Sequence, residues 1–282
     1  MNIDGLVARA QKIRRGVNSS FPFISGDNFA TLADFSFTSK TNHSEMPLAV
    51  SKSKVFFCES RLLSEFLKLT PYVNQNSILM IGNGDQDYHD VSIFPENFST
   101  VLLQNSFISD NKRIFTLPIG IENLHIGVNG IPGRFKPHVR KREGLNTLLI
   151  GPFGDTSSER RLLESFDHLA GISINKPPKR VAAHKYPSLL RGAEWVACPR
   201  GNGIDTHRVW ESLYVGSKPI VLDNLWSRSL VHFGFPLLLT SDWSPNSVLD
   251  SITNYSSQNF EPKQIPILWM DYWKNWLNQR IN

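Results

Sequence analysis

The stretch Cys198–Val221, "CPRGNGIDTHRVWESLYVGSKPIV", places glycines and charged residues between two apolar runs. The preceding run "EWVACP" (194–199) predicts a buried strand, and "KPIVL" (218–222) predicts the next one. The segment between them predicts a helix whose N-cap is Asp205 or Thr206. The stretch is therefore a strand–loop–helix–strand unit, the building block of a parallel α/β sheet.

The same alternation of short apolar runs and helix patterns extends along most of the chain. It predicts an α/β fold with two Rossmann-like halves. The expected strands are 54–58, 77–82, 100–105, 113–120, 147–151, 172–175, 194–199, 218–222 and 236–240. Helices are expected at 26–35, with Asp27 as N-cap and Phe35 on its apolar face, and at 60–69, 156–169, 186–193, 244–255 and 265–281. Thr156 and Glu159 have the spacing of a capping box.

A Gly- and Pro-rich region from Gly120 to Gly144 marks the expected domain boundary. It divides the chain into a first domain, a linker, a second domain and a C-terminal helix. The respective ranges are 1–125, 126–144, 145–260 and 261–282. Ligands of parallel sheets bind beyond the carboxyl ends of the strands. The expected site-forming loops are 82–90, 120–123, 151–156 and 199–206.

Composition favours an ordinary soluble protein, with 40% hydrophobic and 20% charged residues. No apolar run reaches the ~18–20 residues of a membrane helix, and the first residues lack a secretory signal pattern. Cys58 and Cys198 are expected to be buried and reduced, as in a cytoplasmic protein. The net charge of +5 favours an anionic partner. The basic run Arg134–Glu143 is interpreted as a solvated linker, with a peripheral contact to an anionic membrane as the alternative.

The loop and helix of the opening stretch have the chemistry of a phosphate site. Gly201 and Gly203 permit a tight turn and a close approach of backbone to a ligand. The helix start that follows favours an anion. Arg200 and Arg208 can bind a diphosphate with bidentate hydrogen bonds, and Glu211 lies one turn behind Arg208, where it can accept from ribose hydroxyls.

Simpler interpretations of these residues remain open. Asp205 is equally well explained as a helix cap, and Arg208 with Glu211 as a surface pair. The two glycines alone are weak evidence. Only the complete combination of glycines, arginines and helix start favours a phosphate site. The sequence contains no Walker A loop, no dinucleotide-binding fingerprint, no nucleophile elbow and no Cys/His metal spacing.

The opening stretch resembles the signature of exostosin-like glycosyltransferases, which in this chain has the form PRG-x-G followed by R-x-x-E-x-L-x-x-G-x-x-P. Two further segments, "PFISGDNF" (22–29) and "FTLPIGIEN" (115–123), resemble segments of bacterial relatives. One departure is Ser217, where the family often has cysteine. The resemblance implies a GT-B architecture with a cleft between two Rossmann-like domains, of which the first is the acceptor-side domain and the second binds a nucleotide-diphosphate sugar. In GT-B enzymes the C-terminal helix often crosses back to the first domain, and the same is expected here. The resemblance also implies inversion at the sugar without a metal ion or another cofactor.

The resemblance and the loop positions together give a set of expected site residues. The donor-binding residues would be Thr156, Glu122, Asn123, Arg200, Gly201, Asn202, Gly203, Asp205, Arg208 and Glu211. An inverting transferase also needs a base for the acceptor hydroxyl. The loop "GNGDQDYHD" (82–90) supplies Asp85 as first and Asp87 as second candidate, beside Arg208 as a catalytic cation. The alternatives are a polar turn for that loop and for Glu122–Asn123, and a cap for Thr156.

The sequence thus predicts a glycosyltransferase that uses a nucleotide sugar and a saccharide or lipid-linked acceptor. The alternative is a non-catalytic nucleotide-sugar or glycan-binding module on the same fold. A basic nucleic-acid-binding protein is the third hypothesis, but no RRM, KH or helix-turn-helix signature supports it. No nucleic-acid partner is therefore expected.

Overall fold

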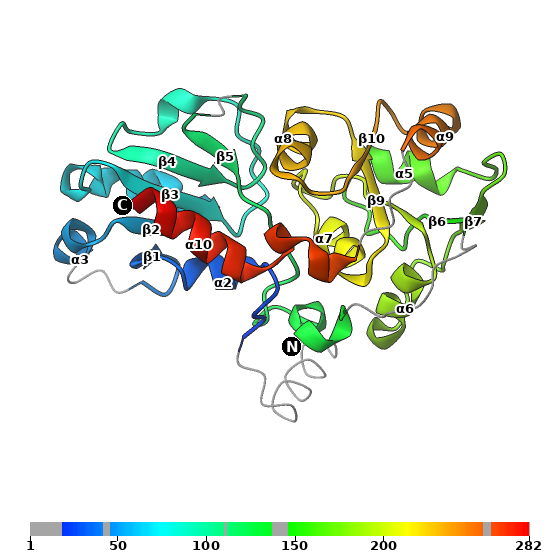
Figure 1. Cartoon of the computed structure of the whole chain (residues 1–282), viewed down its shortest axis with the longest axis horizontal. Helices are drawn as coiled ribbons and strands as arrows, with labels where there is room; N and C mark the ends of the chain where they lie inside the picture. Colours follow the sequence, from blue (N-terminus) through cyan, green and yellow to red (C-terminus); the bar gives the residue numbers. More distant parts are fainter. Residues whose placement is uncertain (1–18, 42–45, 110–111, 137–145, 256–260, 282) are drawn as a thin grey trace.

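The computed structural model describes residues 19–41, 46–109, 112–136, 146–255 and 261–281. Its described strands form two parallel sheets of five strands each, in the orders β1-β2-β3-β4-β5 and β10-β9-β8-β6-β7. The sheets lie side by side, the first built from the N-terminal half and the second from the C-terminal half (Figure 1). The predicted α/β class with two parallel sheets is therefore confirmed.

The first sheet consists of strands whose side chains alternate between two apolar layers. Its strands are β1 Phe35–Phe37, β2 Val55–Glu59, β3 Ser77–Gly82, β4 Phe98–Leu103 and β5 Ile114–Thr116. One layer contains Phe56, Leu79 and Val101, and it is covered by the connecting helices. These are α3 Met46–Lys52, η1 Ser60–Leu62, α4 Leu63–Phe66, η2 Leu67–Tyr72 and η3 Val91–Ile93.

The other face of the first sheet is covered by the two ends of the chain. Helix α2 (Gly26–Ala30) and the C-terminal helix α10 (Met270–Ile281) share its apolar layer. The Trp273 ring lies 5.5 Å from the Phe29 ring, and the Trp276 ring lies 5.2 Å from the Phe115 ring. The C-terminal helix therefore crosses back to the first half, as Figure 1 shows.

The second sheet has a strand order in which the direction of winding reverses. Its strands are β6 Thr147–Leu149, β7 Ser173–Asn175, β8 Trp195–Ala197, β9 Lys218–Leu222 and β10 Leu238–Thr240. From β6 the chain proceeds to β7 on one side and to β8 on the other. The helices of this half are α5 Ser158–Glu164, η6 Ala183–Lys185, α6 Tyr186–Arg191, α7 His207–Val215, α8 Leu225–Phe233 and α9 Pro245–Asn254. Short 3₁₀ turns complete the chain at η4 Val128–Gly130, η5 Pro132–Arg134, η7 Pro262–Gln264 and η8 Pro266–Leu268.

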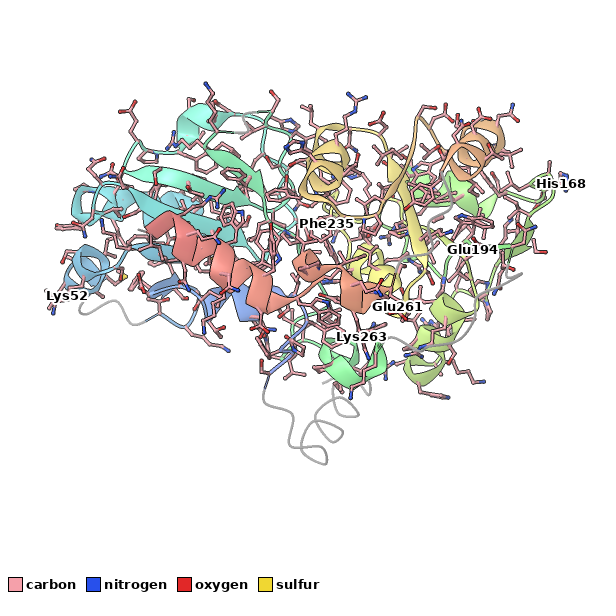
Figure 2. The ribbon with its side chains drawn as sticks, in the orientation of Figure 1. Lys52, His168, Glu194, Phe235, Glu261 and Lys263 are labelled. Atoms are coloured by element: carbon pink, nitrogen blue, oxygen red, sulfur yellow. The ribbon has the colours of Figure 1, made fainter. Side chains whose placement is uncertain are left out.

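The two halves share one apolar core rather than facing each other across open space. A single buried cluster contains Phe57 and Met80 of the first sheet together with Leu149 and Val196 of the second. Between the sheets, the Trp210 ring of α7 packs 4.9 Å from the ring of Phe235, which Figure 2 labels. The described part of the linker also packs, since the Phe135 ring is buried 6.4 Å from that of Tyr186.

The structure corrects several local predictions. Phe35, expected on a helix, begins β1, because α2 ends at Ala30. Ser25 rather than Asp27 is the N-cap of α2, and its hydroxyl accepts from Asn28 N at 3.2 Å. The helix expected at 60–69 is one α-turn between two 3₁₀ segments, the second of which contains Pro71, which lacks an amide hydrogen. Helices α3 and α8 were not predicted.

Other expectations concern single residues and the membrane. Cys58 and Cys198 are buried free thiols, as predicted, and burial raises the pKa of Cys198 to about 12. The departure at Ser217 is accommodated, because its buried hydroxyl donates to Leu190 O at 2.7 Å. Within the described ranges, no helix is long and apolar enough to cross a membrane. Most of the basic run Arg134–Glu143, from residue 137 onward, lies outside the described residues.

Candidate anion site between the two sheets

The loops after β6 and β8 meet at the point where the strand order of the second sheet reverses. Strand β6 pairs with β7 on one side and β8 on the other. Connections leaving such a pair of strands diverge to opposite faces, which leaves a crevice at their carboxyl ends where ligands of open α/β sheets bind. The glycine-rich turn at Arg200–Asp205 follows β8, and the segment Gly151–Ser157 follows β6.

Arg208, in the first turn of α7, points toward the loop after β6. Its guanidinium donates to Gly151 O at 2.9 Å and Pro152 O at 2.5 Å. It also lies over the Phe153 ring at 4.9 Å and near the Tyr186 ring at 5.6 Å from the centroid. Two aromatic rings and two carbonyls therefore fix the plane of this cation without neutralising it.

Two further arginines lie at the same crevice. Arg160 of α5 lies 5.7 Å from the centroid of the Phe153 ring and donates to Arg200 O at 3.0 Å. Burial lowers the pKa of Arg160, and the neighbouring charge of Arg208 lowers it further. Arg200 extends toward the first half, where it donates to Asp87 Oδ2 at 3.0 Å. The guanidinium groups of Arg160 and Arg208 thus share the Phe153 ring, while that of Arg200 reaches from the same turn to the first half.

Arg160 and Arg208 form no ion pair with any residue that the structure describes. Like charges repel, and in a partly buried crevice water screens that repulsion less than at the surface. Such an arrangement is stabilised by an anion that bridges the two cations. The geometry therefore suits a ligand with several anionic oxygens, such as a diphosphate.

The glycines of the turn lie close to side chains of the protein itself. A Cβ on Gly203 would lie 2.8 Å from Asn105 Nδ2 of the first half, and one on Gly201 would lie 3.0 Å from an Arg160 nitrogen. Gly201 N also donates to Gly203 O at 2.9 Å. The sequence predicted glycines for close approach to a ligand, whereas the structure shows that they permit close approach to Asn105 and Arg160.

Ser157 and Glu159 hold this turn in place instead of capping α5. Ser157, the N-cap residue, makes no side-chain cap bond, and its hydroxyl donates to Arg200 O at 3.0 Å. Glu159 Oε2 accepts from Arg200 N at 3.1 Å and from Trp243 Nε1 at 2.9 Å. The predicted capping box of Thr156 and Glu159 is therefore absent. Thr156 is exposed.

Asp205 is a buried structural residue. Its Oδ2 accepts from Ile119 N at 2.8 Å and its Oδ1 accepts from Trp210 Nε1 at 2.7 Å, while its own N donates to Asn105 Oδ1 at 2.9 Å. Burial raises the pKa of Asp205 to about 7, although both bonds favour the charged form. Each carboxylate oxygen is already used inside the protein, so the expectation that Asp205 binds a donor is not supported. Thr206, not Asp205, occupies the N-cap position of α7.

Glu211 lies one helical turn beyond Arg208, as its spacing predicted. It is buried, and its Oε2 accepts from the Tyr186 hydroxyl at 2.9 Å. Burial raises the pKa of Glu211, and the charge of Glu122 from the first half adds to this shift, while His207 and Arg208 oppose it. Glu122 therefore lies within electrostatic reach of Glu211, and its Oε2 also accepts from Asn129 N at 3.1 Å.

The loop after β3 faces the glycine-rich turn across the boundary between the halves. Asp87 forms the ion pair with Arg200, whereas Asp85 is exposed and lies 3.4 Å from Asn202 Nδ2. All four predicted loops thus come together, because His207 Nδ1 also donates to Gly120 O at 2.8 Å. The side chain of Asn123 bonds Asp27 N and Asn83 of the first half rather than any of the three arginines.

Two polar atoms at the crevice have no hydrogen-bond partner among the described residues. They are Asp87 Oδ1 and Thr206 Oγ1, and both are buried. Buried polar atoms without partners are rare in native proteins and mark places where a ligand or water binds. Across the described ranges, no group of three or more His, Cys, Asp or Glu side chains is arranged to hold a metal ion.

Several residues of this site carry no signal in the sequence that points to it. Phe153 and Tyr186 place their rings beside Arg208, and Asn105 bonds the turn from the first half. Arg160 follows the β6 loop, and nothing in its local sequence distinguishes it from Arg161. Only the fold brings these side chains together.

Comparison with known proteins does not assign this site. No protein-family model matches the chain, and no curated protein sequence matches it.

Proposed function

We propose that the chain is a glycosyltransferase that transfers a sugar from a nucleotide-diphosphate sugar to a saccharide or lipid-linked acceptor. The observation that carries this proposal is that Arg160 and Arg208 share the Phe153 ring beside the Arg200 turn, at the switch point of the second sheet. The resemblance of the opening stretch to the exostosin-like signature supports it, because the Arg and Glu of that signature flank this crevice. In this proposal the two sheets form a GT-B-type pair.

Arg208 and Arg160 would bind the diphosphate and stabilise the charge that develops on it as the sugar leaves. Fixed cations in a water-poor site stabilise such charge without reorganisation. The aromatic rings of Phe153 and Tyr186 hold the Arg208 guanidinium in place before the ligand arrives. Glu211, oriented by Tyr186, would accept from the ribose hydroxyls.

The test begins with the donor. Nucleotide sugars carrying UDP, GDP, CMP or dTDP are added to the purified chain, and the melting temperature and the release of free nucleotide are measured. One of them should raise the melting temperature, because a ligand of the native state stabilises it by mass action. Arg208→Ala should lower kcat/KM for that donor by about 10²–10³-fold, the effect of removing one group that stabilises a developing oxyanion.

The matched control is Arg61→Ala, which removes an exposed arginine paired with Glu59 at 3.0 Å in the first half. This variant should turn over the donor like the wild type. Arg208→Lys separates charge from geometry, since lysine keeps the charge but lacks the planar fork. A folded Arg208→Ala protein with wild-type turnover would exclude the proposed donor site.

One observation favours the alternative, a nucleotide-sugar-binding module without chemistry. Asp87, a candidate base from the sequence, is paired with Arg200 at 3.0 Å, so one of its two oxygens is already engaged by the second half. A binding module would show the thermal shift but release no nucleotide and transfer no sugar. Wild-type release of nucleotide above the rate of the spontaneous reaction excludes this alternative.

A further inference from the structure

Two sequence segments that the donor site leaves largely unexplained lie against each other in the first half. They are "PFISGDNF" (22–29) and "FTLPIGIEN" (115–123). Ser25 and Gly120 form an antiparallel bridge, and Ile121 N donates to Ile24 O at 2.9 Å. Gly120 has φ +71°, and a Cβ there would lie 2.1 Å from Ile24 O. This contact therefore requires glycine.

The loop after β3 locks the two segments together. Asp27 N donates to Asn123 Oδ1 at 2.8 Å, and Asn123 Nδ2 donates to Asn83 Oδ1 at 2.8 Å. A Cβ on Gly26 would lie 1.8 Å from Asn83 Oδ1, so Asn83 fits directly against that glycine. Three loops distant in sequence thus fix the position of Asp27.

Asp27 in turn orients a histidine. Its Oδ2 lies 2.8 Å from Nδ1 of His125, and the two side chains are 36% and 51% exposed. A carboxylate only accepts hydrogen bonds, so the imidazole Nδ1 carries the hydrogen and donates it. In the neutral ring Nε2 then holds a lone pair. Within the described residues, no hydrogen bond to this Nε2 is present.

The segment that carries His125 follows directly on residues of the first half that contact the second half beside the anion site. Gly120 O accepts from His207, at the start of α7. Glu122 acts electrostatically on Glu211 behind Arg208. His125 follows three residues later, in the half of the molecule that must supply a base, where Asp87 is already ion-paired.

We propose that His125 is the general base for the acceptor hydroxyl and that Asp27 is its positioning residue. A side-chain base held by a third group is the arrangement by which enzymes activate weak nucleophiles. This inference rests on the proposed function. It replaces Asp85 and Asp87 as the expected base.

In the step, the acceptor O–H proton passes to His125 Nε2, and the oxygen lone pair forms the new bond to the anomeric carbon. The bond between that carbon and the diphosphate oxygen breaks, and its electron pair leaves with the diphosphate. The arginines of the second half hold the resulting charge. The proton on His125 is then released to water.

The test uses the full chain and the nucleotide sugar that gives the largest thermal shift, with water or a simple glycoside as acceptor. His125→Gln should lower kcat for nucleotide release by about 10²–10⁴-fold, the usual contribution of a general base. The donor-induced thermal shift and the KM for donor should stay unchanged, because His125 does not bind the diphosphate. Added imidazole should restore part of the rate of His125→Ala but not alter that of the wild type.

Asp27→Asn should lower kcat less than His125→Gln, again with an unchanged KM for donor, and Asp27→Glu should recover part of the loss. The control is His168→Gln, since Figure 2 shows His168 at the far end of the second half. That variant should behave as the wild type.

The outcomes separate the two proposals. If the wild type is active and a folded His125→Gln protein is equally active, the proposed roles of His125 and Asp27 are wrong and the proposed function stands. Loss of activity without imidazole rescue, and with a lost thermal shift, also overturns these roles, because His125 would then be structural. If the wild type neither binds nor turns over any nucleotide sugar, the proposed function and the roles of His125 and Asp27 are wrong together.

Discussion

Among single residues, the buried carboxyl group of Asp205 joins the two halves through hydrogen bonds. Its oxygens accept from Ile119 N of the first half and Trp210 Nε1 of the second. Burial raises its pKa from the ordinary 3.8 to about 7. Folding therefore disfavours the ionised form, which is the form that dominates in the unfolded chain above pH ~4.

This residue makes stability depend on pH in a defined direction. A group whose pKa is higher in the folded state contributes most below its unfolded pKa, and that contribution is lost as pH rises through the folded pKa. Asp205→Asn, which cannot titrate, should be less stable than the wild type by about 1–3 kcal/mol at pH 4, because one buried bond is lost. The difference in unfolding free energy between the wild type and Asp205→Asn should shrink between pH ~4 and ~7. Urea unfolding at three pH values measures it, and a pH-independent difference would contradict the assignment.

At the scale of elements, the C-terminal helix α10 is part of the core of the first half. Trp273 is fully buried, with ring centroids 5.5 Å from Phe29 and 5.8 Å from Phe233. Trp273→Ala should destabilise the chain by about 3–5 kcal/mol, the cost of removing a large buried ring. Lys274→Ala, at the exposed neighbouring position on the same helix, should change stability by less than about 0.5 kcal/mol. Comparable losses in both variants would mean that α10 does not pack as described.

The elements also show which local predictions the sequence supports. Strands buried on both faces, such as β3 Ser77–Gly82 and β9 Lys218–Leu222, have continuous apolar runs and were predicted with the observed bounds. Helix caps were less predictable. Ser25 caps α2 through a local bond to Asn28. Glu159, in contrast, bonds Arg200 and Trp243 rather than its own helix end, and Ser157 also bonds Arg200. Such partners are absent from any local pattern.

At the scale of the whole molecule, Tyr214 fastens three distant parts of the chain. Its hydroxyl accepts from Ile24 N at 2.8 Å and donates to Leu268 O at 2.6 Å, so α7 is bonded to both ends of the chain. Together with the apolar cluster that spans the two sheets, this predicts that the halves unfold in one cooperative transition.

Tyr214→Phe should destabilise the chain by about 1–3 kcal/mol, because it leaves a buried amide and a buried carbonyl without partners. Calorimetry should show one transition in the wild type at a higher temperature than in this variant. Tyr72→Phe removes a hydroxyl from a side chain that is 49% exposed and should leave the transition unchanged. Two separate wild-type transitions would show that the halves are independent.

The sequence by itself determined the α/β class, the strand–loop–helix–strand unit at Cys198–Val221 and the four loops that come together. These features depend on periodicity and on turn residues, which act over a few neighbours. The tertiary structure alone decided that Asp205 is buried, that Arg160 joins Arg208 over Phe153, and that Asp27 orients His125. The physical reason is that these contacts join residues tens to hundreds of positions apart. Their geometry follows from how the two sheets pack and not from any local preference of the chain.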